Sequence, residues 1–149
     1  MDRNSLKHLI DSCFTAKRIV ETLPQLPNGM KTRHIHVLDA IQEILSVQKM
    51  CRVSDVSTRL NITMPSVTKL IQELEQLGLV TKQPDPNDKR AALLCLTEDG
   101  IKCVTKHVLD FHTEWAKALS DVSDEQAQEV IAVIEKLRLT MPGIQGGKN

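Results

Sequence analysis

The chain has 149 residues, of which 41% are hydrophobic, and its formal net charge at pH 7 is zero. This length and apolar content fit a single domain, residues 1–149, with an ordinary hydrophobic core, and the neutral charge excludes binding to nucleic acid by bulk basicity alone. No stretch is apolar enough to span a membrane and residues 1–9 are too polar for a signal peptide, so we expect a cytoplasmic protein without a membrane partner.

Two helices are predicted in the first third of the chain. In residues 3–22 apolar side chains recur at helical intervals, and the prolines and glycine of the run LPQLPNG then end the helix. A second helix is expected over residues 31–47, where Val37, Leu38 and Ile41 lie on one face. The run between them separates the first helix from the segments that follow.

Two further helices are predicted close together. The first is short and amphipathic, with Ser54 as its expected N-cap and residues 61–62 at its end. The second covers residues 63–77, where Thr63 is expected to cap the helix and Pro65 lies in the first turn, in which a missing N–H costs nothing. Two helices joined by about three or four residues are typical of a helix-turn-helix.

A β-hairpin is predicted directly after this pair. Gly78 closes the preceding helix, and short apolar runs at residues 79–82 and 91–96 flank the turn PDPNDKR like the two arms of a hairpin. A helix-turn-helix followed by a hairpin with a basic tip is the arrangement of a winged helix, and residues 31–100 are predicted to form one.

The last part of the chain is predicted to be helical. Thr97 opens a long helix that runs to about residue 119, and Ser123 and Gln126 form a capping box for a final helix, after which MPGIQGGKN is expected to fray. Residues 3–22 and 98–140 have broad apolar faces and little to pack on, so we expect them to be dimerisation helices of a homodimer. The predicted fold is therefore mainly α, with a small β-hairpin wing.

The polar face of residues 63–77 carries groups that bond phosphates or base edges. These candidate DNA contacts are Thr63, Ser66, Thr68, Lys69 and Gln72. Glu73 and Glu75 lie further along, and because carboxylates repel phosphates the N-terminal half should enter a major groove first. The competing interpretation is an ordinary amphipathic helix with a solvated polar face.

The tip of the hairpin carries Asp88, Lys89 and Arg90. An arginine on a slim two-stranded arm reaches into a minor groove, where a narrow A·T-rich geometry concentrates negative potential. Asp88 is expected to hold the Arg90 guanidinium through a bidentate pair. A solvated turn is the competing interpretation, but the helix-turn-helix immediately upstream favours contact with double-stranded DNA.

A family resemblance is carried by the segment VSDVSTRLNITMPSVTKLIQELEQLGLVTKQPDPNDKRAALLCLTEDG. It resembles the winged-helix core of the MarR (multiple antibiotic resistance regulator) family in its recognition segment SVTKLIQELEQLGLV, its D-x-R wing motif and its LTEDG opening of a long helix. The resemblance implies a bacterial, homodimeric transcriptional regulator, with recognition helices in successive major grooves of a pseudo-palindromic operator and wings in the flanking minor grooves. We expect a repressor released by a small-molecule effector or another signal.

The resemblance also assigns roles to particular positions. Groove-facing positions match Ser66, Thr68, Lys69 and Gln72. Arg90 matches the wing arginine and Asp88 its partner. Lys82 stands where the family often has arginine; its point charge still suits a phosphate but lacks bidentate geometry.

Thiol or metal sensing is an alternative that involves Cys13, His34 and His107. Cys13 lies near the reactive thiol of a peroxide-sensing branch of the family, but that branch uses tyrosine hydroxyls and this sequence has no tyrosine. The histidines fall near positions of a zinc-sensing branch whose histidine-rich run is missing here. The four cysteines form no CxxC pair, so we expect structural thiols and no metal site.

An enzyme and a protein-binding module are two other function classes for a chain of this size. The sequence has no glycine-rich phosphate loop, nucleophile elbow or HExxH motif, so we expect no enzyme, no catalytic residue and no cofactor. A winged helix that binds protein without contacting DNA remains an alternative, because a fold does not fix a function.

Overall fold

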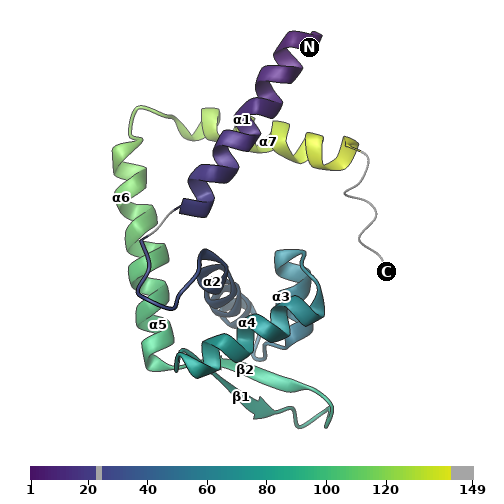
Figure 1. The fold of residues 1–149 in the computed structure, drawn as a ribbon, viewed down its shortest axis with the longest axis vertical. Coiled ribbons are helices and arrows are strands. Elements are labelled where there is room, and N and C mark those ends of the chain that lie inside the picture. The colour runs from purple at the N-terminus through teal and green to yellow at the C-terminus, as the bar shows by residue number, and fades with distance from the viewer. Residues whose placement is uncertain (23–24, 142–149) are drawn as a thin grey trace. The chain divides into compact units, whose positions relative to one another are not determined.

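The computed structural model describes residues 1–22 and 25–141, which fall into two compact units, Met1–Phe111 and His112–Asn149. The helices and strands follow one another along the chain as drawn in Figure 1. They are α1 (Arg3–Thr22), α2 (Thr32–Val47), α3 (Val53–Leu60), α4 (Met64–Gln76), β1 (Val80–Pro84), β2 (Ala92–Leu96), α5 (Glu98–Val104), the π-helical turn η1 (Thr105–Asp110), α6 (Phe111–Ala118) and α7 (Asp124–Thr140). The predicted mainly helical fold with one hairpin is confirmed. That residues 1–149 form a single domain stays a prediction.

Helix α2 lies at the centre of the core in the first unit. Its residues Val37, Leu38 and Ile41 are fully buried, and α3, α4, α5 and β2 all pack against it. The other fully buried apolar side chains come from these surrounding elements, from the start of β1 and from the segment just before α3. They are Cys51, Val56, Val67, Ile71, Leu74, Val80, Leu94 and Val104. Each large apolar side chain removed from water in this way contributes about 1.5–3 kcal/mol.

Helix α4 begins and ends where its sequence indicates. The Thr63 hydroxyl accepts the Ser66 N–H at 3.4 Å, Pro65 lies in the first turn, and Gly78 follows the helix with a φ of 72° that favours glycine. Its apolar side chains Val67, Leu70, Ile71 and Leu74 are buried, whereas Leu77, the C-cap residue at the end of the helix, is 38% exposed.

The prediction of Ser54 as the N-cap of α3 is wrong. The N-cap is Arg52, whose backbone N–H donates to the Asp55 carboxylate at 2.8 Å. Residues 51–52 are extended here because they pair with β2: Arg52 forms an isolated antiparallel bridge with Leu93, and the Leu94 N–H donates to the Cys51 carbonyl at 2.7 Å. The helix therefore begins at Val53.

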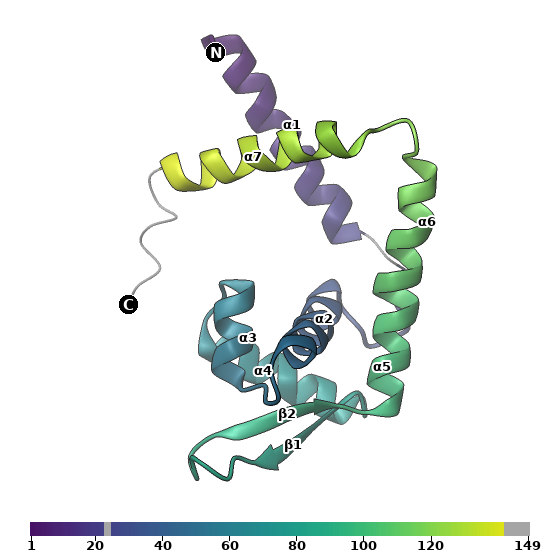
Figure 2. The ribbon, with the colours of Figure 1, turned by 180° about the vertical axis from the view of Figure 1, so that it is seen from behind.

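Strands β1 and β2 form the hairpin, and together with their turn, residues 80–96, they make up what we call the wing (Figure 2). They are antiparallel, with Val80 opposite Leu96 and Pro84 opposite Ala92. The first arm is longer than predicted, since β1 continues to Pro84. The turn between the strands is therefore residues 85–91 instead of the predicted 84–90, and the Asp85 N–H donates to the Ala91 carbonyl at 3.3 Å across its base.

A tight corner joins the wing to α5. The Thr97 N–H donates to the Leu79 carbonyl at 3.1 Å, and the Thr97 hydroxyl donates to the Gly78 carbonyl at 2.7 Å and accepts the Gly100 N–H at 3.0 Å. A Cβ atom at Gly100 would lie 2.1 Å from the Leu79 carbonyl oxygen. Only glycine allows this approach of two backbones, which explains the glycine of the LTEDG motif.

The predicted long helix after Thr97 is interrupted by a π-helical turn. Helical conformation continues from α5 through η1 into α6, and η1 buries His107 and Val108 and packs against α2. A π-turn carries one extra residue per turn, so it changes which residues face the core. The spacing of apolar residues in the sequence does not reveal such a change.

The terminal helices α1 and α7 expose large apolar side chains. Helix α7 starts with the predicted capping box, in which the Gln126 N–H donates to the Ser123 hydroxyl at 3.2 Å, and it buries no residue. The exposed apolar side chains of the two helices are Leu6, Phe14, Ile19, Val20, Val130, Ile131, Val133, Ile134 and Leu139. Residues 23–24, at the start of the run that was predicted to end the first helix, lie outside the described residues, as do residues 142–149 of the tail that was predicted to fray. No helix among the described residues is long and apolar enough to cross a membrane.

We expect Gly100→Ala to lower the free energy of unfolding by about 3 kcal/mol or more, because the new Cβ must displace backbone rather than a flexible side chain. Gly78→Ala is the matched control: it has open space around its Cβ and carries only the strain of a positive φ, about 1 kcal/mol. Urea denaturation followed by circular dichroism measures both. Equal losses in the two variants would contradict the close approach.

Candidate nucleic-acid interface

Helix α4 packs through one face and presents the other to solvent. Ser66, Thr68, Lys69 and Gln72 are all exposed, whereas Val67 between them is fully buried. The structure therefore brings the predicted groove-facing residues together on one exposed surface. Thr63 lies at the end of this surface, with its hydroxyl oxygen 2.8 Å from that of Ser66, so these two hydroxyls also shape the cap.

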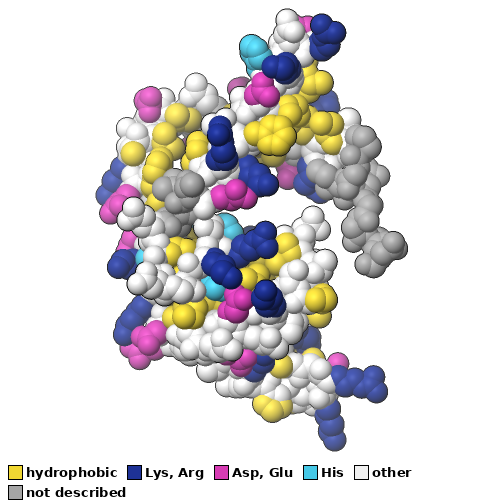
Figure 3. All heavy atoms as spheres, viewed as in Figure 1, with side chains coloured by type: hydrophobic (Ala, Val, Ile, Leu, Met, Phe, Trp, Pro, Cys, Tyr) yellow, Lys and Arg dark blue, Asp and Glu magenta, His cyan; other side chains and the backbone are white. Residues whose placement is uncertain are grey.

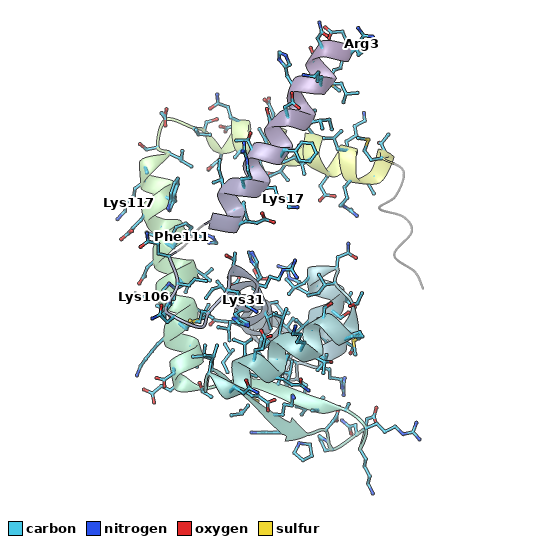
Figure 4. The ribbon with its side chains drawn as sticks, in the orientation of Figure 1. Arg3, Lys17, Lys31, Lys106, Phe111 and Lys117 are labelled. Atoms are coloured by element: carbon cyan, nitrogen blue, oxygen red, sulfur yellow. The ribbon has the colours of Figure 1, made fainter. Side chains whose placement is uncertain are left out.

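The two carboxylates further along α4 are held by cationic or hydrogen-bonding side chains. Glu73 Oε2 lies 2.6 Å from His34 Nε2 and 3.8 Å from Lys31 Nζ, and Glu75 Oε2 lies 2.7 Å from Lys82 Nζ. Lys31 stands at the start of α2 (Figure 4). Both carboxylates of the recognition helix are thus turned toward partners within the protein, and Lys82 is already paired.

His34 is buried and uses both ring nitrogens. Its Nδ1 accepts the Lys31 N–H at 3.0 Å, which completes the cap of α2, so in the neutral ring Nε2 carries the proton and donates it to Glu73. This hydrogen bond is the main reason that the pKa of Glu73 lies below its usual value. The imidazole therefore joins α2 to the recognition helix.

The other candidate sensor residues are scattered. His107 is buried in η1, and this burial is the main reason that its pKa lies below the usual value. Among the described residues no group of three or more histidines, cysteines and carboxylates is placed to hold a metal ion. A redox role for Cys13, which is half-buried on α1, stays untested.

The tip of the wing projects its basic side chains into solvent. Lys and Arg side chains stand out from the end of the hairpin (Figure 3), where Lys89 and Arg90 are exposed. The expected pairing of Asp88 with the guanidinium does not form. The Asp88 carboxylate instead accepts the backbone N–H of Arg90 at 2.9 Å, because in this turn the nearest donor is the main chain two residues on.

The base of the wing contains a pair that the sequence did not single out. Arg52 Nε donates to Asp85 Oδ2 at 2.6 Å, and Asp85 Oδ1 accepts the Asn87 N–H at 2.8 Å. These two bonds, the one from Arg52 first, keep the pKa of Asp85 below its usual value. The only local signal was the turn-forming sequence around Asp85, which indicates the turn but not the distant arginine.

A small cavity of about 240 Å³ opens beside the start of the recognition helix. It lies where α2 meets the end of α3 and the start of α4. Its lining residues are Arg33, His36, Leu60, Ile62, Ser66 and Leu70. Three of the lining residues are apolar, and Arg33 contributes a cation.

The winged segment has relatives of known family. A sequence model of the MarR family matches residues 28–91, the span from the start of α2 to the tip of the wing. The HTH-type transcriptional regulator YkoM of Bacillus subtilis is 27% identical over 97 residues, which cover 65% of this chain and 63% of YkoM. Residues 28–91 are thus similar to the MarR family, and the curated relatives are HTH-type transcriptional regulators. That family is one of transcription regulators and not of enzymes.

Two solved MarR-like structures share the fold. PcaV from Streptomyces coelicolor, in complex with its natural ligand, matches with a TM-score of 0.69 at 18% identity over 90% of this chain and 92% of PcaV. A mutant MarR from E. coli, complexed with operator DNA, matches with a TM-score of 0.67 at 21% identity over 89% of this chain and 93% of that MarR. The chain spans 56–63% of the length of three curated relatives, YkoM among them.

We expect the stability that Glu73 contributes to depend on pH. Its folded pKa lies below the usual value of 4.5, so the ionised carboxylate stabilises the fold above about pH 4.5, and this contribution is lost as pH falls through the folded pKa. The difference in free energy of unfolding between wild type and Glu73→Gln should therefore be constant near neutrality and shrink below about pH 4.5. The difference should be much smaller in a His34→Ala background; an unchanged pH dependence there would contradict the assigned cause.

Proposed function

We propose that this protein is a homodimeric transcriptional regulator that binds a pseudo-palindromic operator in double-stranded DNA, with α4 in the major groove and the wing in the minor groove. The observation that carries the proposal is electrostatic. In the described part of the chain, no ion pair holds Lys69, Lys89 or Arg90, whereas Glu73 and Glu75 are both paired. Free cations thus face solvent on the surface that resembles a DNA-reading surface.

This local pairing answers the objection raised by the neutral net charge. Attraction to phosphates depends on the cations that lie within about a Debye length of the duplex, roughly 8–10 Å, rather than on the sum over the chain. Carboxylates that are bonded within the protein repel DNA less than free ones. Ser66, Thr68 and Gln72 supply the neutral donors and acceptors that read base edges or phosphates.

The homodimer is supported by the exposed apolar faces of α1 and α7. Ile131, 51% exposed, and its apolar neighbours on α7 gain about 25 cal/mol for each Å² that a second copy covers. Two copies at fixed spacing would present two recognition helices to successive major grooves. A binding unit without a basic surplus requires that doubling to reach useful affinity.

Regulation by a small molecule and repression are proposed from the family. PcaV was solved with its natural ligand and the E. coli MarR with operator DNA, and both share this fold. We propose no cofactor and no enzymatic activity for this chain, and a cytoplasmic location where it meets DNA. A winged helix that binds protein alone is the second candidate, favoured by the zero net charge.

We expect Arg90→Ala to raise the Kd for DNA about fivefold or more, because the loss of a well-placed arginine contact to DNA costs about 1–3 kcal/mol. The probe is a fluorescein-labelled duplex enriched from a random-sequence library by binding to the wild-type protein, and fluorescence anisotropy gives the Kd. Arg138→Ala removes the same charge from α7, outside the winged segment. Where sedimentation shows the oligomeric state of the wild type, this variant should bind DNA like wild type. Failure to enrich any duplex would favour the protein-binding alternative, and unchanged affinity with native circular dichroism would remove Arg90 from the interface.

We expect Ile131→Glu to convert the dimer to a monomer in sedimentation at micromolar concentration, because it places a charge on the apolar face of α7. Footprinting of the wild type on the enriched duplex should protect two half-sites about 10 bp apart. The variant should lose that paired protection. A wild-type monomer would contradict the role proposed for the terminal helices.

A further inference from the structure

The carboxylate at the base of the wing is unusual in its burial. The Asp85 side chain is 0% exposed, while β1 is exposed from Thr81 to Pro84 and the turn is exposed from Pro86 to Arg90. A buried carboxylate is strongly unfavourable unless its charge is paired and its oxygens accept hydrogen bonds. The burial of Asp85 therefore requires partners, and those partners fix where the wing lies.

Each oxygen of Asp85 binds a different part of the structure. Oδ2 accepts from the Arg52 guanidinium at 2.6 Å, and Oδ1 accepts from the backbone N–H of Asn87 at 2.8 Å. Arg52 is the N-cap of α3, whereas Asn87 lies in the turn that leads to Arg90. One side chain thus connects the helix-turn-helix to the turn that carries the wing arginine.

Arg52 is itself held in place through its backbone. Its N–H donates to the Asp55 carboxylate at 2.8 Å, and the residue pairs with Leu93 of β2. A two-stranded hairpin is marginally stable by itself and is free to twist and bend. The ladder between β1 and β2 sets the shape of the wing, and the connections at Arg52 set its direction relative to α3.

We propose that Arg52 is a positioning residue for DNA binding: through Asp85 it holds the wing at the angle at which Arg90 enters the minor groove while α4 occupies the major groove. The inference rests on the proposed function. The guanidinium acts on the wing rather than on DNA, and its effect on affinity passes through Arg90. The dependence on Arg90 distinguishes this role of Arg52 from a direct contact with a DNA phosphate. The Arg52 side chain is 35% exposed, so its exposure alone would permit either role.

The test is a double-mutant cycle on the enriched duplex with wild type, Arg52→Ala, Arg90→Ala and the double variant. Arg52→Ala should raise the Kd about fivefold to tenfold, and in the Arg90→Ala background it should add almost nothing, because the residue that it positions is gone. Fold-changes that multiply would overturn the inference. An Arg90→Ala protein that binds like wild type would instead refute the proposed wing contact from which the inference starts.

A matched control comes from the same helix. Arg59 of α3 pairs with Glu43 of α2 and does not reach the wing. Whatever Arg59→Ala does to the Kd, its fold-change should be the same with and without Arg90. If Arg59→Ala also lost its effect in the Arg90→Ala background, the masking would be general and the inference would fail.

Two further measurements cover misfolding and direct contact. Arg52→Ala leaves a buried carboxylate unpaired, whereas the Arg52→Ala/Asp85→Asn variant removes both charges. This variant should keep native circular dichroism, and its effect on the Kd should likewise disappear in the Arg90→Ala background.

In the Arg90→Ala background, Arg52→Ala should leave the slope of log K against log salt unchanged. A slope reduced by about 0.9 would reveal a lost phosphate contact and overturn the inference.

Discussion

The packing of α4 on α2 decides which side chains of the recognition helix meet solvent. Val67, Ile71 and Leu74 are fully buried in the core that α2 centres, so the residues between them face outward by helical geometry. The hydrogen bond from His34 to Glu73 adds a directional contact to this non-directional burial. Hydrophobic packing alone would tolerate small rotations of α4 about its axis, whereas a 2.6 Å bond from a buried, fully bonded imidazole does not.

Charge in this protein is organised by pairing rather than by excess. The chain is neutral as a whole, yet Glu73 and Glu75 of α4 are paired with Lys31, His34 and Lys82. Among the described residues, the cationic side chains at the wing tip form no ion pair. Such an arrangement keeps non-specific attraction to polyanions modest while it leaves a few cations in defined positions. Affinity for DNA would then depend on how these cations are placed. Two copies of the surface at fixed spacing would add more to that affinity than they do in a strongly basic protein.

The wing depends on contacts at its base. A short ribbon has no core of its own, and its position is fixed where Leu79, Thr97 and Gly100 form a tight corner and where Arg52 meets Asp85. The first set of contacts joins the wing to α5 and the second joins it to α3. The position of the wing therefore depends on both helices.

The sequence by itself determined the elements whose signals are local. Helical periodicity gave the helices, and Thr63, Gly78 and the capping box at Ser123 gave helix ends to within a residue or two, because caps and left-handed turns involve neighbours in the chain. The exposed face of α4 followed from the same periodicity. A family resemblance added the expected roles of these residues.

Only the tertiary structure decided what depends on residues far apart in the chain. The N-cap of α3 is Arg52 and not Ser54, because Arg52 pairs with Leu93 of β2, a contact that no local pattern encodes. The bonds between His34 and Glu73 and between Arg52 and Asp85 span 39 and 33 residues, and the burial that makes them important exists only once the core has formed. Local chemistry therefore specifies which elements form, and long-range packing specifies how they are oriented toward a partner.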